Sequence, residues 1–71
     1  MNMVPVSSTN LSSVGYDPAT QRLRVAFIRG GLYEYSSVDA SVHAALMSAS
    51  SHGTYFDTHI KNGHYNFHKI A

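Results

Sequence analysis

The sequence has 71 residues, and this length predicts one small domain that spans residues 1–71. It contains no cysteine, which excludes disulfides and thiolate metal sites. Only 13 % of the residues are charged, about half the usual share of roughly 25 %, and the formal net charge is +1. So small a charge argues against tight non-specific binding to nucleic acid, which draws its affinity from neutralised phosphates. Because no apolar stretch approaches the about 20 residues of a membrane span, and the N-terminus does not resemble a signal peptide, we expect no membrane contact and a cytoplasmic location.

Four segments of the sequence have the pattern of β-strands. Residues 3–8 predict an edge strand, because Pro5 has no backbone N–H to donate to a neighbouring strand. The other expected strands cover residues 11–16, 22–28 and 32–36, where apolar and polar side chains alternate. Turn residues separate them, so consecutive strands are expected to pair as antiparallel neighbours.

The length of the loop between the third and fourth expected strands decides which side chains share a face. A two-residue glycine loop would place polar residues on the apolar face. A three-residue loop over residues 29–31 instead pairs Phe27 with Tyr33 and Val25 with Tyr35, which keeps the large side chains together. We therefore expect this second register.

Two helices are expected after the strands. Apolar residues recur at helical spacing over residues 39–50, behind an aspartate that can cap the first turn. Gly53 is expected to stop this helix. Thr54 and Asp57 have the spacing of a capping box and predict a short second helix over residues 54–61.

These elements predict an α+β domain: a four-stranded, mainly antiparallel meander with one longer and one short helix packed on one face. Residues 64–71 could be irregular or could add a strand. The expected core consists of Val4, Val6, Val14, Tyr16, Leu23, Val25, Phe27, Tyr33, Tyr35, Val42, Leu46, Ala49, Phe56 and Ile60.

Short motifs along nearly the whole chain carry a family resemblance. They are Ser7-Ser8, Val14-Gly15-Tyr16-Asp17, Leu23-Arg24-Val25-Ala26-Phe27, Gly31-Leu32-Tyr33-Glu34-Tyr35, Val38, Ala49-Ser50-Ser51-His52-Gly53-Thr54-Tyr55-Phe56, Ile60-Lys61 and Tyr65. In this order and spacing they resemble the KTSC domain, which is named for an appendage at the C-terminus of some lysyl-tRNA synthetases. The family also occurs as small stand-alone proteins in bacteria and phages, and this chain is expected to be of that kind.

The resemblance implies a small α+β domain with a suggested role in RNA binding. The sequence departs from the family pattern at two places. A typical basic pair near the C-terminus is represented by His68-Lys69, and a proline that commonly starts the helix is replaced at Asp39-Ala40. The first departure weakens the nucleic-acid interpretation slightly, whereas the second concerns only the start of the helix.

Tyr33 and Tyr35 lie two residues apart, so both rings are expected on one face of their strand. Such a pair can stack on nucleic-acid bases or can form part of the core. The expected register favours the core, and both interpretations stay open. If the tyrosines belong to the core, a binding role falls to the opposite face, which carries Arg22, Arg24 and Glu34.

The function that we expect is a non-catalytic module that binds RNA or a nucleotide-type ligand. Cations of the hairpin and the C-terminal segment would contact phosphates, and aromatic rings, Phe67 among them, could stack on bases. The candidate ligand-binding residues are Arg22, Arg24, Arg29, Tyr55, Lys61, His64, Tyr65, His68 and Lys69.

Two alternatives stay open beside this expectation. The low charge and a free edge strand are compatible with a phage or bacterial protein-interaction module, which would bind a host factor or form a homo-oligomer. A sponge for a small signalling nucleotide is the third interpretation.

Neither catalysis nor a cofactor is expected. The chain has no nucleophile elbow, and its Gly-Gly pair joins two strands rather than opening a helix. His59, His64 and His68 lie near Asp57 in the sequence, but their spacing is looser than that of structural zinc sites. We therefore expect no metal site.

Overall fold

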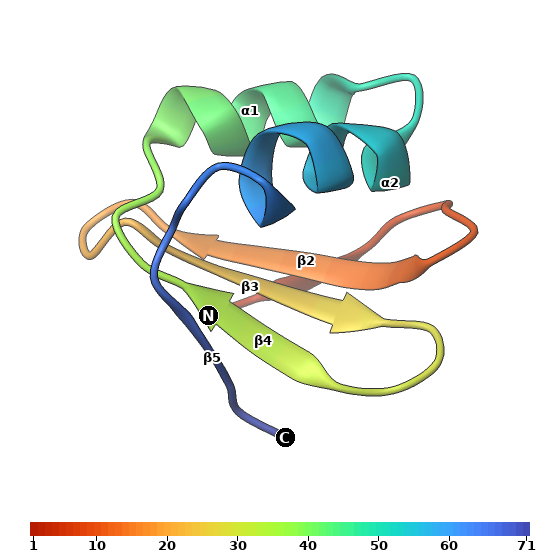
Figure 1. Cartoon of the computed structure of the whole chain (residues 1–71), viewed down its shortest axis with the longest axis horizontal. Coiled ribbons are helices and arrows are strands. Elements are labelled where there is room, and N and C mark those ends of the chain that lie inside the picture. Colours follow the sequence, from red (N-terminus) through yellow and green to blue (C-terminus); the bar gives the residue numbers. More distant parts are fainter.

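The computed structural model describes all residues, 1–71, as one sheet with its helices on a single face (Figure 1). Five strands follow one another in the order β1-β2-β3-β4-β5, and every neighbouring pair is antiparallel. The strands are β1 (Met3–Pro5), β2 (Leu11–Asp17), β3 (Arg22–Phe27), β4 (Leu32–Tyr35) and β5 (Phe67–Lys69). The predicted α+β class and the antiparallel meander are confirmed.

The predicted number of four strands is wrong by one, because the C-terminal segment pairs with β4. Backbone hydrogen bonds extend this pairing beyond β5, since Ser36 donates to Asn66 at 2.9 Å and Leu32 donates to Ala71 at 2.9 Å. The segment reaches β4 only after the chain has passed through both helices. Its strand therefore depends on a partner distant in the sequence, which local alternation does not reveal.

The predicted register of the β3–β4 hairpin is wrong by two residues. Val25 pairs with Tyr33 and Leu23 with Tyr35. Phe27 closes the loop by donating to the Gly31 carbonyl at 3.1 Å, so the three loop residues are 28–30. A shift of two leaves each side chain on its face, and the predicted grouping of the large residues on the apolar face therefore holds.

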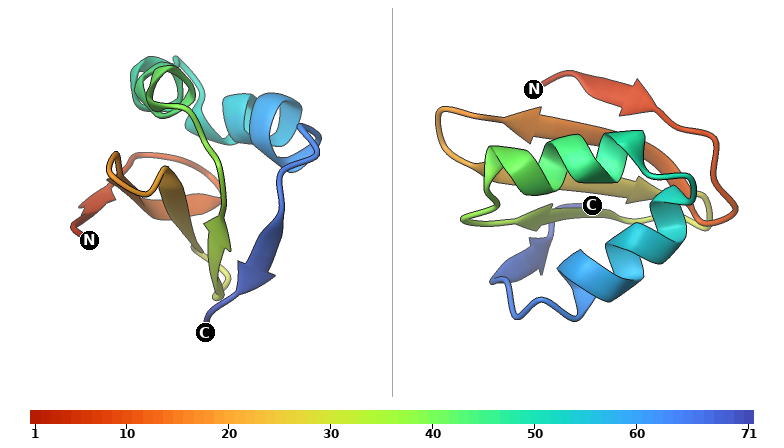
Figure 2. Two further views of the ribbon diagram at one scale, coloured as in Figure 1. Left: turned by 90° about the vertical axis from the view of Figure 1, so that its left-hand side faces the viewer. Right: turned by 90° about the horizontal axis from the view of Figure 1, so that it is seen from above.

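Three consecutive helical segments connect β4 to β5. They are α1 (Ala40–Ser48), α2 (His52–Tyr55) and the π-helical segment η1 (Phe56–Lys61). Figure 2 shows that α1 lies over β2 and β3, whereas α2 and η1 run across toward the β5 edge. Asp39 caps α1 as predicted, because its side chain accepts a 3.0 Å hydrogen bond from the Ser41 amide.

The predicted start of the second helix is wrong. Ser51, not Thr54, is the N-cap, and its hydroxyl accepts from the Thr54 amide at 3.3 Å. Gly53 lies inside α2 and is buried, although a terminating role was predicted for it. A Cβ atom at this position would lie 2.1 Å from Asn10 Oδ1, so the glycine permits close packing against the loop before β2.

The core lies between the sheet and the helices. Seven of the predicted core residues are buried, and Leu11 and Val38, which were not predicted, complete this cluster. Val6, Tyr16, Phe27, Tyr33 and Val42 pack against it as half-buried side chains. Ala49 is half-buried and outside this group, and Val4 is 48 % exposed because β1 is an edge strand without a helix above it. None of the helices combines the length and the apolar character that crossing a membrane would require.

Candidate ligand-binding groove

A groove of about 700 Å³ opens between η1 and the apolar face of β3, β4 and β5. We call it the aromatic groove, and its lining residues are Asn10, Phe27, Arg29, Gly30, Tyr33, Tyr35, Phe56, Asp57, Lys61, Asn62 and Phe67. The volume lies within the range of about 300–1,000 Å³ that small-molecule sites usually have. One concave surface thus brings together residues from the loop before β2, the β3–β4 hairpin, η1 and β5.

Five aromatic rings form the walls of the aromatic groove and contact one another in sequence. Phe56 lies edge-on to Phe27 and to Tyr35, each at 5.5 Å between ring centroids. Phe67 stacks on Tyr35 at 5.3 Å and remains 58 % exposed. An exposed ring beside buried ones offers a flat apolar surface that a ligand could cover.

Tyr35 is a lining residue of the groove that carries a hydroxyl. The residue is 5 % exposed, and its hydroxyl makes no hydrogen bond within the chain. The hydroxyl is not sealed in the interior, since no buried side-chain oxygen or nitrogen lacks a partner. Burial raises the pKa of Tyr35, and Tyr33 and Asp57 raise it further, so the hydroxyl keeps its proton and can donate.

Cations surround the mouth of the aromatic groove. Arg29 reaches it from the hairpin loop and Lys61 from the end of η1. Lys69 pairs with Tyr33 across β4 and β5 and therefore extends from the same face. None of these three side chains forms an ion pair with an acid of the chain, and all three are exposed. Asp57 is the only acid that lines the groove.

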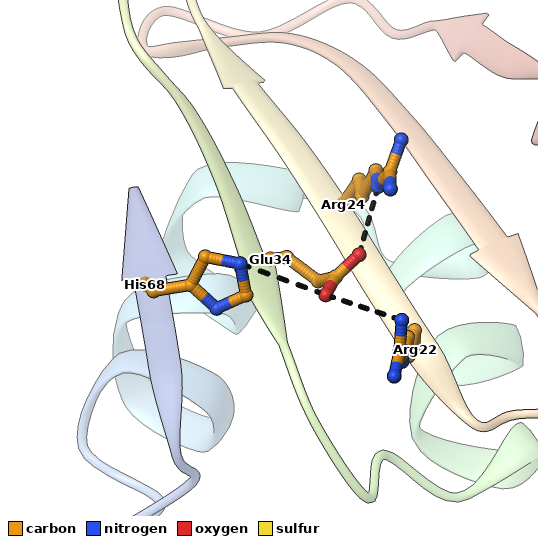
Figure 3. A network of polar contacts seen from close by, with 4 residues as sticks. All are labelled: Arg22, Arg24, Glu34 and His68. Carbon is orange, nitrogen blue, oxygen red and sulfur yellow. Dashed lines mark hydrogen bonds and ion pairs between the residues drawn. The ribbon is translucent and has the colours of Figure 1, made fainter. Parts of the chain in front are cut away.

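The other predicted cations lie on the opposite face of the sheet, around Glu34 (Figure 3). Arg24 Nε donates to Glu34 Oε1 at 2.9 Å, while Arg22 and His68 each lie 3.8 Å from Glu34 Oε2. The side chain of Glu34 is only 5 % exposed, because these neighbours cover it. The hydrogen bond from Arg24 and the nearby positive charges hold the pKa of Glu34 below its ordinary value.

The predicted binding residues therefore separate into two groups. Arg29 and Lys61 line the aromatic groove together with Phe67, and Lys69 extends from the same face of the sheet. The other group consists of Arg22, Arg24 and His68. These three side chains surround Glu34, whose negative charge already balances part of their positive charge. A phosphate at this second group would lie close to Glu34 and would be repelled by it.

The three remaining predicted residues lie outside both groups. Tyr55 packs against His59 with 4.3 Å between ring centroids. His64 is exposed in the connection after η1 and has a positive φ of 63°. Tyr65 is half-buried against the core. The structure contains no group of three or more His, Cys, Asp or Glu side chains that could hold a metal ion.

Six lining residues of the groove were given no binding role in the sequence analysis, namely Asn10, Phe27, Gly30, Phe56, Asp57 and Asn62. Phe56 was predicted only as core, and Asp57 was considered only for capping and for metal binding. The one signal in the sequence is the proximity of Asp57, Lys61 and Asn62 at helical spacing. That spacing does not indicate which strands the segment faces.

Comparisons with known proteins agree with the resemblance seen in the sequence. The family model of the KTSC domain matches residues 7–65. A crystal structure of a KTSC domain protein from Yersinia pestis superposes with a TM-score of 0.91 at 37 % identity, covering 99 % of this chain and 97 % of the other. An uncharacterized protein of Stutzerimonas stutzeri is 41 % identical over 70 residues, which cover 99 % of both chains. A lysine–tRNA ligase of a Nostoc species is 38 % identical over 56 residues, or 79 % of this chain and 10 % of that protein.

Proposed function

The chain belongs to the KTSC domain family, and from this premise we propose that it is a non-catalytic module whose aromatic groove binds single-stranded RNA or a nucleotide-type ligand. The observation that carries the proposal is the convergence of an aromatic wall, whose Phe67 ring is exposed, and unpaired cations at one concave surface. Rings accept the flat faces of bases, and cations accept phosphates, so the two features together match a nucleotide.

Two further points support RNA as the ligand class. One relative is named as a lysine–tRNA ligase, and a segment of it matches this chain. The three unpaired cations lie on the groove side of the sheet, whereas the two paired arginines lie on the other side. We propose that the protein binds this RNA in the cytoplasm of a bacterium or of a phage-infected cell.

A salt series with a labelled uridine pentamer tests this proposal. Anisotropy titrations between about 50 and 200 mM salt should give a falling affinity, with a slope of about 0.7 for each phosphate contact in single-stranded ligands. Lys61→Gln or Arg29→Gln should each reduce that slope. Arg22→Gln removes the same charge from the opposite face and serves as the matched control. Equal effects of all three variants, or binding without a salt slope, would contradict the proposal.

A sponge for a small signalling nucleotide is favoured by the size of the aromatic groove, which could enclose one or two bases. Thermal unfolding with a panel of cyclic nucleotides distinguishes it from an RNA-binding module. A ligand at about 100 times its dissociation constant adds about 2.7 kcal/mol to the free energy of unfolding. A shift with one cyclic nucleotide, together with no binding of the pentamer, would favour the sponge.

A protein-interaction role is favoured by the face of the sheet that no helix covers. Ile70 follows His68 by two residues, so alternation places it on this face, where it is 40 % exposed, and Ile28 in the adjoining hairpin loop is 57 % exposed. The edge strands β1 and β5 are also free to pair with another chain. Light scattering on the purified protein at high concentration tests the homo-oligomer, and capture from a bacterial extract tests a host factor. A monomer that captures nothing would contradict this role.

A further inference from the structure

An acid at a site for phosphate-bearing ligands requires an explanation. Asp57 lines the aromatic groove, is exposed, and forms no ion pair although Lys61 lies one helical turn away. Its charge opposes phosphate binding, so the carboxylate has no use in the phosphate contacts themselves. A carboxylate is an acceptor with two oxygens, and it can receive two parallel hydrogen bonds from adjacent donors.

A second polar group faces the same space. Tyr35 lines the aromatic groove and is only 5 % exposed, and its hydroxyl has no hydrogen-bond partner within the chain although solvent can reach it. Asp57 and Tyr35 line the same groove, so one ligand can contact both residues. Because the phenol keeps its proton, it offers one donor beside the two acceptor oxygens of the carboxylate.

Among the RNA bases, guanine alone presents the complement of this set. Its Watson–Crick edge carries two adjacent donors, N1–H and the N2 amine, followed by the O6 acceptor. Adenine, cytosine and uracil each place a ring nitrogen or carbonyl acceptor beside their donor, and a carboxylate repels that acceptor. We propose that Asp57 and Tyr35 read the Watson–Crick edge of an unpaired guanine held in the aromatic groove, with Asp57 accepting from N1–H and N2 and Tyr35 donating to O6. This inference rests on the proposed function.

Guanine recognition is tested with three RNA pentamers that differ only in the central base. They are UUGUU, UUIUU and UUAUU, where I is inosine. The wild-type protein should bind UUGUU about tenfold more tightly than UUAUU, in the range that a bidentate base contact provides. Inosine lacks the N2 amine and should fall between the two. Ratios of affinities are compared, because removing a negative charge alone raises the affinity for every pentamer.

Two variants assign the discrimination to its residues. Asp57→Asn should reduce the guanine-to-adenine ratio to near one, and Tyr35→Phe should reduce it in part while leaving the ring in place. Asp17→Asn makes the same acid-to-amide change at the end of β2, outside the groove, and should leave the ratio unchanged. Circular dichroism confirms that each variant is folded.

The outcomes separate the two proposals. Equal binding of UUGUU and UUAUU, with a normal salt slope, would overturn guanine reading and leave the binding function in place. An unchanged ratio in Asp57→Asn would overturn the role of this residue. If no pentamer binds at low salt, the proposed function falls, and guanine reading falls with it.

Discussion

Arg24 Nε lies 2.9 Å from Glu34 Oε1 on the face of the sheet that carries no helix, and the two residues are cross-strand partners in β3 and β4. An acid in such an open position is usually solvated, yet the side chain of Glu34 is only 5 % exposed. Its carboxylate thus depends on Arg24, Arg22 and His68 for the contacts that water would otherwise supply. We interpret this group as part of the scaffold that joins β3, β4 and β5.

Replacing Glu34 by Gln should lower the free energy of unfolding by about 1–2 kcal/mol, because a charge-assisted hydrogen bond becomes a neutral one beside partly exposed arginines. Urea denaturation measures the difference. Asp57→Asn is the matched control, since Asp57 is exposed and unpaired, and it should stay within about 0.5 kcal/mol of wild type. A neutral Glu34→Gln variant would show that the ion-pair group does not support the sheet.

The contribution of Glu34 should also depend on pH. Its pKa in the folded protein is held below the ordinary value of 4.5, mainly by the hydrogen bond from Arg24. The unfolded chain therefore binds the proton first, and the stabilisation is fully present above that value. It is lost as the pH falls through the lower pKa of the folded state. Urea titrations of wild type and Glu34→Gln at pH 5 and below should converge with acid, and a gap that persists or widens would contradict this assignment.

Truncating the two tyrosines of β4 should have unequal effects. Tyr35 is 5 % exposed and contacts Phe56 and Phe67, so Tyr35→Ala should cost about 3–5 kcal/mol. Tyr33 is half-buried, and Tyr33→Ala should cost about 1–3 kcal/mol. Tyr35→Phe should be nearly neutral, because the hydroxyl makes no hydrogen bond within the chain. Equal losses for both alanine variants, measured by urea denaturation, would contradict the observed burial.

Gly53 and Asn10 should be coupled. Alanine is favoured over glycine inside helices by about 1 kcal/mol, yet a Cβ at Gly53 would lie 2.1 Å from Asn10 Oδ1. Gly53→Ala should therefore destabilise the wild-type protein and stabilise the Asn10→Ala variant, a reversal that a double-mutant cycle detects. The same sign in both backgrounds would show that the contact with Asn10 is unimportant.

Local patterns predicted those features that depend on neighbouring residues. The alternation of Leu23 and Val25 with arginines placed β3 correctly, and the aspartate at position 39 marked the start of α1. Features that depend on distant partners were missed or wrong. The strand at Phe67–Lys69 needs β4 beside it, and the close packing of Gly53 inside α2 involves Asn10, which is distant in the sequence.

The candidate site was predictable only in part for the same reason. The sequence placed Arg22 and Arg24 on the face opposite the tyrosines, but it still grouped them with Arg29, Lys61 and Lys69 in one candidate site. The separation follows from the alternation of faces in β3 and from the ion pairs with Glu34. The alternation of faces follows from the strand itself, whereas the ion pairs depend on a cross-strand register that was predicted two residues out of place.

The central claim is that ligand binds in the aromatic groove rather than on the face around Glu34. Two-dimensional NMR of the labelled protein during titration with UUGUU tests it most directly, because each backbone amide reports separately. We predict shift changes concentrated at Arg29, Lys61 and Phe67, with little change at Arg22 and Arg24. Changes concentrated at Arg22 and Arg24, or none at any amide, would contradict the account.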